Sequence, residues 1–213
     1  MTVFTLALVV PWASGIVLVL CDGRRRTVGW IAVAAIAANL AAVLVLGASV
    51  LSGGPVGATT GGWPTGIGIA LRADALGVVF AALSSFALLA ATVHEVLHGV
   101  RERVFPGVVV LLAAALTGVF LTGDLFNFYV FFELAMAAGY IPATYGGTRR
   151  ELGAGLVFTA VNLLGTFVFV LSVAGVYHVT GTLEMAQIAA RLGDVNPNVA
   201  MLIAVGFFIA FGV

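Results

Sequence analysis

Long apolar runs separated by short polar loops constrain this chain more than any other feature. An α-helix needs about 20 predominantly apolar residues to cross a hydrocarbon core of roughly 30 Å. Six such runs and the start of a seventh lie near residues 2–20, 27–51, 75–97, 106–122, 125–146, 154–178 and 198–213. The sequence therefore predicts an all-α polytopic membrane protein in which residues 1–213 form a single bundle.

The composition excludes several other classes of protein. Hydrophobic residues make up 62% of the chain and charged residues 8%, whereas about a quarter of the residues of soluble domains are charged. The formal net charge is zero, which argues against a nucleic-acid partner and against a polybasic lipid-binding patch. The lone Cys21 excludes an internal disulfide and a cysteine-based metal site. We therefore expect a chain embedded in the lipid bilayer, with no nucleic-acid partner.

The positions of the arginines predict the orientation in the membrane. The alternate loops on one side of the membrane hold two arginines, Arg72 and Arg191. The loops on the other side hold seven: Arg24, Arg25, Arg26, Arg101, Arg103, Arg149 and Arg150. Because loops rich in Lys and Arg stay in the cytoplasm, the N terminus is expected outside. The first run is not a signal peptide, since its arginines follow it. The glycine-rich loop 52–74 is then external, and its alternating Ile67, Ile69 and Leu71 predict a short hairpin.

One acidic residue, Glu133, lies inside the fifth apolar run. A carboxylate near the centre of a bilayer costs roughly 2.5 to 3.5 kcal/mol, so such a residue is a candidate for function. Helical spacing places Tyr129 and Tyr140 on the same face, where their hydroxyl groups could hydrogen-bond a carboxyl group. The plain alternative is that Glu133 only links helices through hydrogen bonds, as we expect of Asn39 and Asn162.

The sixth apolar run has a polar stripe of its own. Thr159, Asn162 and Thr166 fall on one side of the expected helix. Two facing polar stripes can enclose a few water molecules, which conduct protons. The fifth and sixth runs therefore predict a proton-translocation site at Glu133, supported by Tyr129, Tyr140, Asn162 and Thr166.

Three blocks of sequence resemble one family of transporter subunits. The block GDLFNFYVFFELAMAAGY, residues 123–140, resembles the fifth-helix signature of the D-type component of Mrp multisubunit sodium/proton antiporters. That family is similar to the antiporter-like membrane subunits of complex I and of membrane-bound hydrogenases. The blocks GGWPTGIGIALRADAL, residues 61–76, and NLLGTFVFVLSVAGVYHVTGTLEMAQIA, residues 162–189, match the same component in the same order. The resemblance therefore extends over most of the chain from Gly61 onward.

The resemblance implies a fold, ions and partners. The expected protein has about fourteen helices, with two inverted repeats that each hold a broken helix and a hydrated half-channel. It needs no cofactor and is not itself an enzyme. It works in the cytoplasmic membrane with other integral membrane subunits, and exchanges H⁺ for Na⁺ or another monovalent cation. A proton-pumping subunit of an assembly like complex I (NADH-quinone oxidoreductase) or a hydrogenase is the alternative.

The resemblance also assigns roles to two acidic residues. Glu133 matches the glutamate that family members use for proton translocation, paired with a lysine on the seventh helix. Asp124 matches the aspartate of the signature, although capping of the helix start explains it as well. This chain has no lysine, and the family's lysine follows a stretch like FFIAFGV, residues 207–213. We therefore expect either the N-terminal part of a longer subunit or a short form that needs another polypeptide.

The sequence HEVLH, residues 94–98, indicates a different chemistry. It fits the H-E-x-x-H pattern of zinc metalloproteases, with His94 and His98 as zinc ligands and Glu95 as general base. A third protein ligand is needed, and on that side of the membrane only Glu102 and Glu151 could supply it, both in arginine-rich loops. A helix end at the level of the lipid headgroups is the plainer interpretation. An intramembrane protease and a structural scaffold subunit are thus the less favoured alternatives, and no metal is expected.

Overall fold

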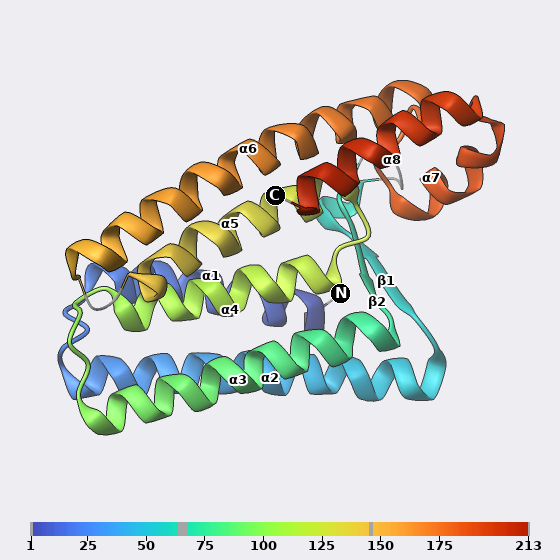
Figure 1. Cartoon of the computed structure of the whole chain (residues 1–213). Helices are drawn as coiled ribbons and strands as arrows, with labels where there is room; N and C mark the ends of the chain where they lie inside the picture. Colours follow the sequence, from blue (N-terminus) through green and yellow to red (C-terminus); the bar gives the residue numbers. More distant parts are fainter. Residues whose placement is uncertain (1, 64–67, 145–146, 213) are drawn as a thin grey trace.

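The computed structural model describes residues 2–63, 68–144 and 147–212, and it is predominantly helical. Figure 1 shows the helices and strands with their labels, coloured from the N terminus (blue) to the C terminus (red). The elements are α1 (Thr2–Leu20), α2 (Arg26–Gly53), β1 (Val56–Thr59), η1 (Thr60–Gly62), β2 (Ala70–Ala73), α3 (Ala75–His98), α4 (Phe105–Leu121), α5 (Leu125–Ala143), α6 (Arg149–Thr180), α7 (Met185–Arg191), η2 (Leu192–Asp194) and α8 (Pro197–Gly212).

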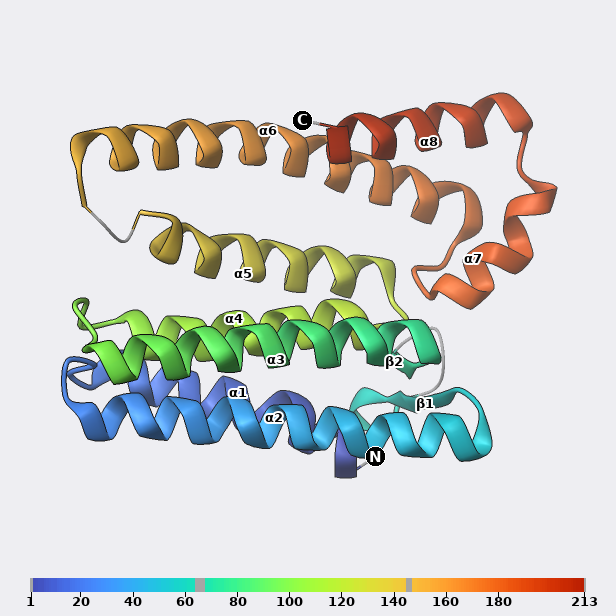
Figure 2. The ribbon, with the colours of Figure 1, turned by 60° about the horizontal axis from the view of Figure 1, so that its bottom comes forward.

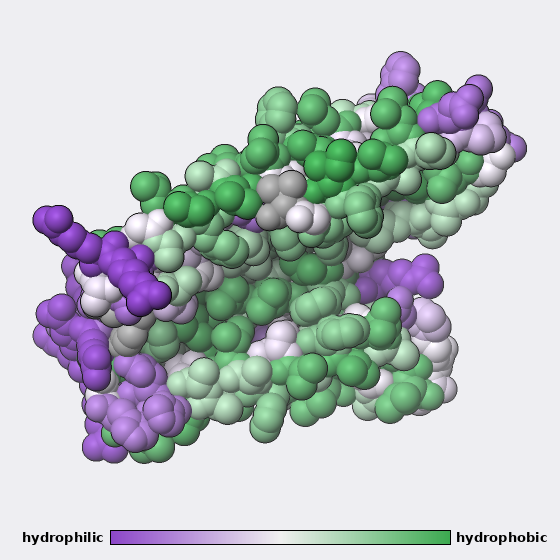
Figure 3. Space-filling model, viewed as in Figure 1, coloured by the Kyte–Doolittle hydropathy of each residue, from purple (hydrophilic) through white to green (hydrophobic). Residues whose placement is uncertain are grey.

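Five of these helices are long and apolar enough to cross a membrane: α1, α2, α3, α5 and α6. Helices α4 and α8 are apolar but shorter, with 17 and 16 residues. The count of six full spans expected from the sequence is therefore not confirmed by length, because α4 reaches only about 25 Å. Hydrophilic residues gather at the two ends of the helices, and apolar surface covers the length between them (Figure 3). The chain is a multi-pass membrane protein.

Several helix boundaries differ from the expected ones. Helix α6 begins at Arg149, earlier than the expected start near residue 154, because Thr148 and Glu151 form a capping box. The amide of Glu151 donates to the Thr148 hydroxyl at 3.2 Å, and the amide of Thr148 donates to the Glu151 carboxylate at 2.9 Å. Helix α5 ends at Ala143, and residues 145–146 of its expected range lie outside the described residues. Helix α7 has no counterpart among the expected helices.

The helices form a tight group and a looser outer layer. Helices α1, α2, α3 and α4 pack against one another as one group, and α5 packs on α4. Figure 2 shows α5 between this group and the layer formed by α6 and α8. The close contact between α4 and α5 depends on Gly118, because a Cβ atom there would overlap the ring of Phe131. Glycine at this position therefore lets the two helices approach.

The two ends of the bundle differ in charge and structure. We call one the arginine-rich end; it carries Arg24, Arg25, Arg26, Arg101, Arg103, Arg149 and Arg150. There the Arg24 guanidinium donates to the Arg101 carbonyl at 2.9 Å, which joins the α1–α2 and α3–α4 connections. We call the other the hairpin end; it holds β1, β2 and α7 (Figure 1).

The strands β1 and β2 pair antiparallel, with Val56 opposite Ala73 and Thr59 opposite Ala70. Of the residues whose alternation predicted a hairpin, Leu71 lies in β2, and Ile67 lies outside the described residues. The amide of Gly123 donates to the Ala70 carbonyl at 2.8 Å. The hairpin therefore fastens the α2–α3 connection to the turn between α4 and α5.

The side chain of Asn39 joins the four helices of the tight group. It is fully buried in α2, and its amide nitrogen donates to the Ala7 carbonyl of α1 at 2.7 Å. Its amide oxygen accepts from Ser85 of α3 at 2.8 Å and from Thr117 of α4 at 3.2 Å. The amide of Asn39 thus finds its partners inside the protein, as an apolar surrounding requires.

We predict that Asn39→Ala lowers the stability of the tight group by about 2 kcal/mol, because several interhelical hydrogen bonds are lost together. Thermal unfolding of the purified protein in detergent measures this as a lower midpoint. Ser49→Ala is the control on the same helix, since Ser49 is exposed and its hydroxyl donates within α2, to the Val45 carbonyl. Equal midpoints for both variants would contradict the role of Asn39.

Candidate functional site

Helix α5 begins at a well-defined cap. The amide of Asn127 donates to the Asp124 carboxylate at 2.7 Å, and the Asn127 side chain donates to the Thr122 hydroxyl at 3.0 Å. The first bond satisfies a backbone donor that a helix start leaves free, and the second joins the first turn of α5 to Thr122. With the start fixed and Phe131 packed on α4, the face of α5 that carries Glu133 turns toward α6.

Glu133 lies in a cavity of about 210 Å³ between α5, α6 and α8. The hydroxyl of Thr166, on α6, donates a hydrogen bond to Oε1 of Glu133. The space is sufficient for several water molecules, and the few polar side chains in its mostly apolar lining offer them partners. The lining residues are Tyr129, Phe132, Glu133, Met136, Phe158, Val161, Asn162, Gly165, Thr166, Phe169, Ala210 and Phe211.

A second hydrogen bond extends the polar groups beyond this cavity. The amide nitrogen of Asn162 donates to the hydroxyl oxygen of Tyr140 at 2.8 Å. The helical spacing places Tyr140 on the same face as Glu133, where it could bond the carboxyl group, but Tyr140 lies about two helical turns further along α5 and bonds Asn162. Asn162 also lines the cavity and therefore links Tyr140 to the space that holds Glu133.

The other two polar residues expected at the site behave differently. Tyr129 lines the cavity, and its ring stacks on Phe169 with centroids 5.9 Å apart. Thr159 turns away, because its hydroxyl donates to the Gly155 carbonyl of its own helix at 2.8 Å. The polar stripe of α6 that reaches the cavity is therefore limited to Asn162 and Thr166.

An aromatic cluster next to Glu133 was not predicted from the sequence. The ring of Phe169 lies 6.0 Å from that of Phe128, 5.1 Å from Phe207 and 5.5 Å from Phe211, centroid to centroid. The signal that could have found it was the spacing of four between Phe128 and Phe132 and between Phe207 and Phe211, which places each pair on one helix face.

Asp124 is not part of the Glu133 cavity. It lies at the hairpin end, where its backbone pairs with that of Glu184 in an isolated antiparallel bridge. Burial raises the pKa of the Asp124 carboxyl above 3.8; backbone N–H groups of Asn127 and Phe126 lower it in part, and the charge of Glu184 raises it further. Asp124 therefore acts in the structure as a cap and as a neighbour of Glu184.

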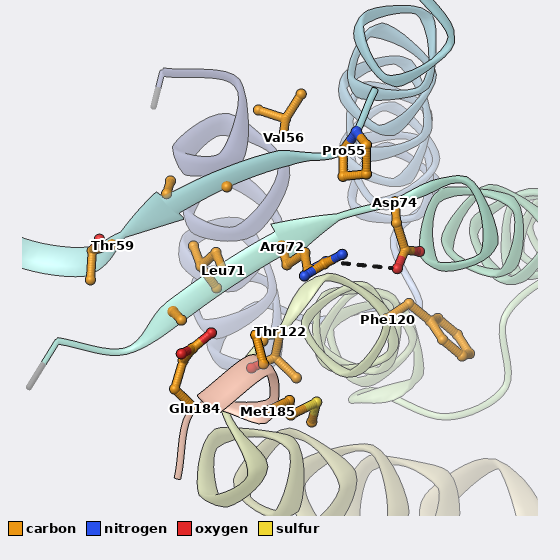
Figure 4. A pocket seen from close by; sticks show the side chains of 15 residues that line it. Pro55, Val56, Thr59, Leu71, Arg72, Asp74, Phe120, Thr122, Glu184 and Met185 are labelled. Atoms are coloured by element: carbon orange, nitrogen blue, oxygen red, sulfur yellow. Dashed lines mark ion pairs between the residues drawn. The ribbon is translucent and has the colours of Figure 1, made fainter. Parts of the chain in front are cut away.

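A larger cavity of about 670 Å³ lies at the hairpin end, as Figure 4 shows. Its walls come from β1, β2, the α4–α5 turn and the start of α7, and include Thr122 and Glu184. Arg72 and Asp74 form an ion pair there with 4.0 Å between Nε and Oδ2, and the two side chains are 53% and 46% exposed. An exposed pair of this length contributes little to stability.

The HEVLH segment forms the end of α3. The rings of His94 and His98 stack with centroids 4.1 Å apart, and Nδ1 of His98 lies 2.8 Å from the His94 carbonyl oxygen. Within residues 2–63, 68–144 and 147–212, no group of three or more His, Cys, Asp or Glu side chains could hold a metal ion. In the described part of the chain, a zinc site that uses Glu95 as base thus has no third protein ligand.

Comparison with known proteins places this site in a family context. Residues 122–213, which include Glu133, Asn162 and Thr166, match the NADH:quinone oxidoreductase/Mrp antiporter transmembrane family. The resemblance to the D-type component of Mrp antiporters is confirmed. The chain is 31% identical over 210 residues to the D component of the Na(+)/H(+) antiporter of Alkalihalophilus pseudofirmus, an alignment that covers 97% of this chain and 43% of that protein.

Solved structures have the same fold. A chain of the Mrp complex from Dietzia sp. DQ12-45-1b superposes with a TM-score of 0.86 and 26% identity, over 99% of this chain and 40% of that one. A chain of respiratory complex I from Thermus thermophilus superposes with a TM-score of 0.80 and 24% identity, over 99% of this chain and 43% of that one. At this identity the likeness is one of fold alone. The chain spans about two fifths of the length of the curated relatives it matches.

We predict that Asp124→Asn changes how stability depends on pH. The raised pKa means that the folded state holds the Asp124 proton more tightly than the unfolded state, so Asp124 lowers stability as pH rises from 3.8 through the raised pKa. Asparagine keeps the cap and removes the charge. Thermal unfolding midpoints measured across this pH range should rise for the variant relative to the wild type as pH increases. Above the raised pKa, the difference between the two midpoints should become constant.

Asp194→Asn, at an exposed position, is the control and should parallel the wild type. A wild type that gains stability relative to Asp124→Asn as pH rises would contradict the direction of the shift.

Proposed function

We propose that this chain is part of the ion-translocating component of a multisubunit monovalent cation/proton antiporter, with Glu133 as the intramembrane proton site. One observation carries the proposal: the Glu133 carboxyl lies inside an apolar helix, in a partly polar cavity, and accepts a hydrogen bond from Thr166. An ionisable residue in such a position is expected to serve ion transport. The relative from Alkalihalophilus pseudofirmus, named as part of a Na(+)/H(+) antiporter, supports exchange as the activity.

In the proposed mechanism, Glu133 takes and releases the transported proton. Thr166 orients the carboxyl group toward α6, and water in the cavity connects it with Asn162 and Tyr140. The charge on Glu133 is coupled to a cationic partner. The chain has no lysine, so a lysine in this role comes either from a further part of the same subunit or from another polypeptide.

We further propose that the protein works in the cytoplasmic membrane, with its arginine-rich end in the cytoplasm and its N terminus outside. The arginines gathered at one end support this orientation. The partners are other integral membrane subunits, as in the Mrp complex whose chain shares the fold.

A proton-pumping subunit of a redox-driven assembly is the second candidate. The matched family includes NADH:quinone oxidoreductases as well as Mrp antiporters. The two functions differ in their energy source. An antiporter exchanges cations for protons without an electron donor, whereas a redox-driven pump moves protons only when a donor is oxidised. Transport assays with and without a donor distinguish the two.

We predict that Glu133→Gln leaves the assembled complex intact and abolishes cation/proton exchange in membrane vesicles, because glutamine can accept the Thr166 hydrogen bond but cannot carry a proton. Exchange is measured as the cation-dependent collapse of a pH gradient. Glu102→Gln, which changes a carboxylate at the arginine-rich end, is the control and should exchange normally. Full exchange by Glu133→Gln or Glu133→Ala would indicate a structural scaffold and contradict the proposal.

A further inference from the structure

The hydrogen-bonded polar groups that begin at Glu133 continue toward the arginine-rich end of the bundle. Thr166 bonds the Glu133 carboxyl, and Asn162 lies about one turn of α6 closer to the arginine-rich end. There Asn162 bonds Tyr140, which lies about 10 Å along α5 from Glu133 in the same direction. Polar side chains therefore lead from Glu133 toward the arginine-rich end.

On the other side of Glu133, toward the hairpin end, the surrounding side chains are mainly aromatic rings. Phe169 follows Thr166 on α6 in the direction of the hairpin end and is only 5% exposed. Rings from α5 and α8 surround it, with centroid distances of 5.9 Å to Tyr129, 5.1 Å to Phe207 and 5.5 Å to Phe211. Phe169 thus joins three helices immediately beside the cavity that holds Glu133.

Two further contacts widen this arrangement into a layer. The ring of Phe132 lies 6.2 Å from Phe211 and 6.1 Å from Phe128, centroid to centroid. Phe132, Phe169 and Phe211 also line the Glu133 cavity. We define the aromatic layer as Phe128, Tyr129, Phe132, Phe169, Phe207 and Phe211.

A layer of this kind has a physical consequence for protons. A proton moves between carboxyl groups along water or hydroxyl groups. The phenylalanine rings of the layer offer neither, and Tyr129, its member with a hydroxyl group, stacks on Phe169. Apolar constrictions in membrane proteins close pathways by excluding water. With centroids about 5 to 6 Å apart, the rings lie at the separation at which aromatic side chains pack directly on one another.

We infer that the aromatic layer centred on Phe169 is the dry barrier on the hairpin-end side of Glu133, so that Glu133 exchanges protons with the arginine-rich end while the layer is closed. This inference rests on the proposed proton role of Glu133. It adds a one-sided access and names the side chains that enforce it. Opening toward the hairpin end then requires the rings of Phe207 and Phe211, on α8, to separate from Phe169.

The experiment uses the complete complex in vesicles of one orientation, with the pH set separately on each side. Dicyclohexylcarbodiimide dissolves in the bilayer and reacts with protonated carboxyl groups, and mass spectrometry of the α5 peptide reports the modification of Glu133. Labelling should follow the pH at the arginine-rich end and decrease as that pH rises, because only the protonated carboxyl group reacts. Labelling of Glu133 should stay constant when only the pH at the hairpin end changes.

Variants test which side chain forms the barrier. Phe169→Ala should make labelling respond to the pH on both sides and let a pH gradient decay faster. Phe169→Leu, which keeps an apolar side chain of similar size, should retain the one-sided pattern. Phe167→Ala removes a ring that is 64% exposed from another face of the same helix, and this matched control should behave like the wild type.

Two outcomes overturn the inference. Wild-type labelling that follows the pH at the hairpin end contradicts the barrier without any variant. One-sided labelling in a folded Phe169→Ala complex contradicts the role of Phe169. The exchange assay of Glu133→Gln separates this result from a failure of the proposed function. If Glu133 is not the proton site, Glu133→Gln still exchanges cations for protons. If only the barrier is wrong, Glu133→Gln is inactive.

Discussion

The need to satisfy Asn39 inside an apolar bundle fixes the first half of this protein. A buried amide in a bilayer has no water to bond, so neighbouring helices must supply its partners. Ala7, Ser85 and Thr117 do so from α1, α3 and α4. The Asn39 amide can bond all of these partners in one arrangement of the four helices. It therefore sets their relative heights and rotations. The hairpin and the α4–α5 turn then extend that arrangement to α5.

Packing becomes looser with distance from this group. Helix α4 is buried along much of its length, whereas α5 has Asn127 and Ala135 buried, and α8 has no buried residue among those the structure describes. The cavity of Glu133 lies at this boundary, with α5 held on the tight group and α8 in contact mainly with α6. The proposed change of access needs one fixed wall and one that moves, and α8, which has few contacts outside α6, is the candidate for the moving wall.

Features that depend on local spacing were predictable from the sequence. The apolar runs located the long helices, and helical periodicity placed Asn162 and Thr166 on the side of α6 that reaches Glu133. The predicted start of α6 was wrong although its capping box, Thr148 and Glu151, can be read from the chain. The bond between Tyr140 and Asn162 depends on how α5 and α6 rotate against each other, which periodicity does not determine.

The aromatic layer could not be predicted for the same reason, since it combines residues of α5, α6 and α8 that are far apart in the chain. Its energy suits a barrier that opens. Four ring contacts on Phe169, at about 0.5 to 1.5 kcal/mol each, amount to roughly 2 to 6 kcal/mol. Holding an ionised carboxyl group beside a dry layer costs several kcal/mol as well. Because the two energies are of similar size, the proposed proton loading of Glu133 and the proposed opening of the layer would be linked.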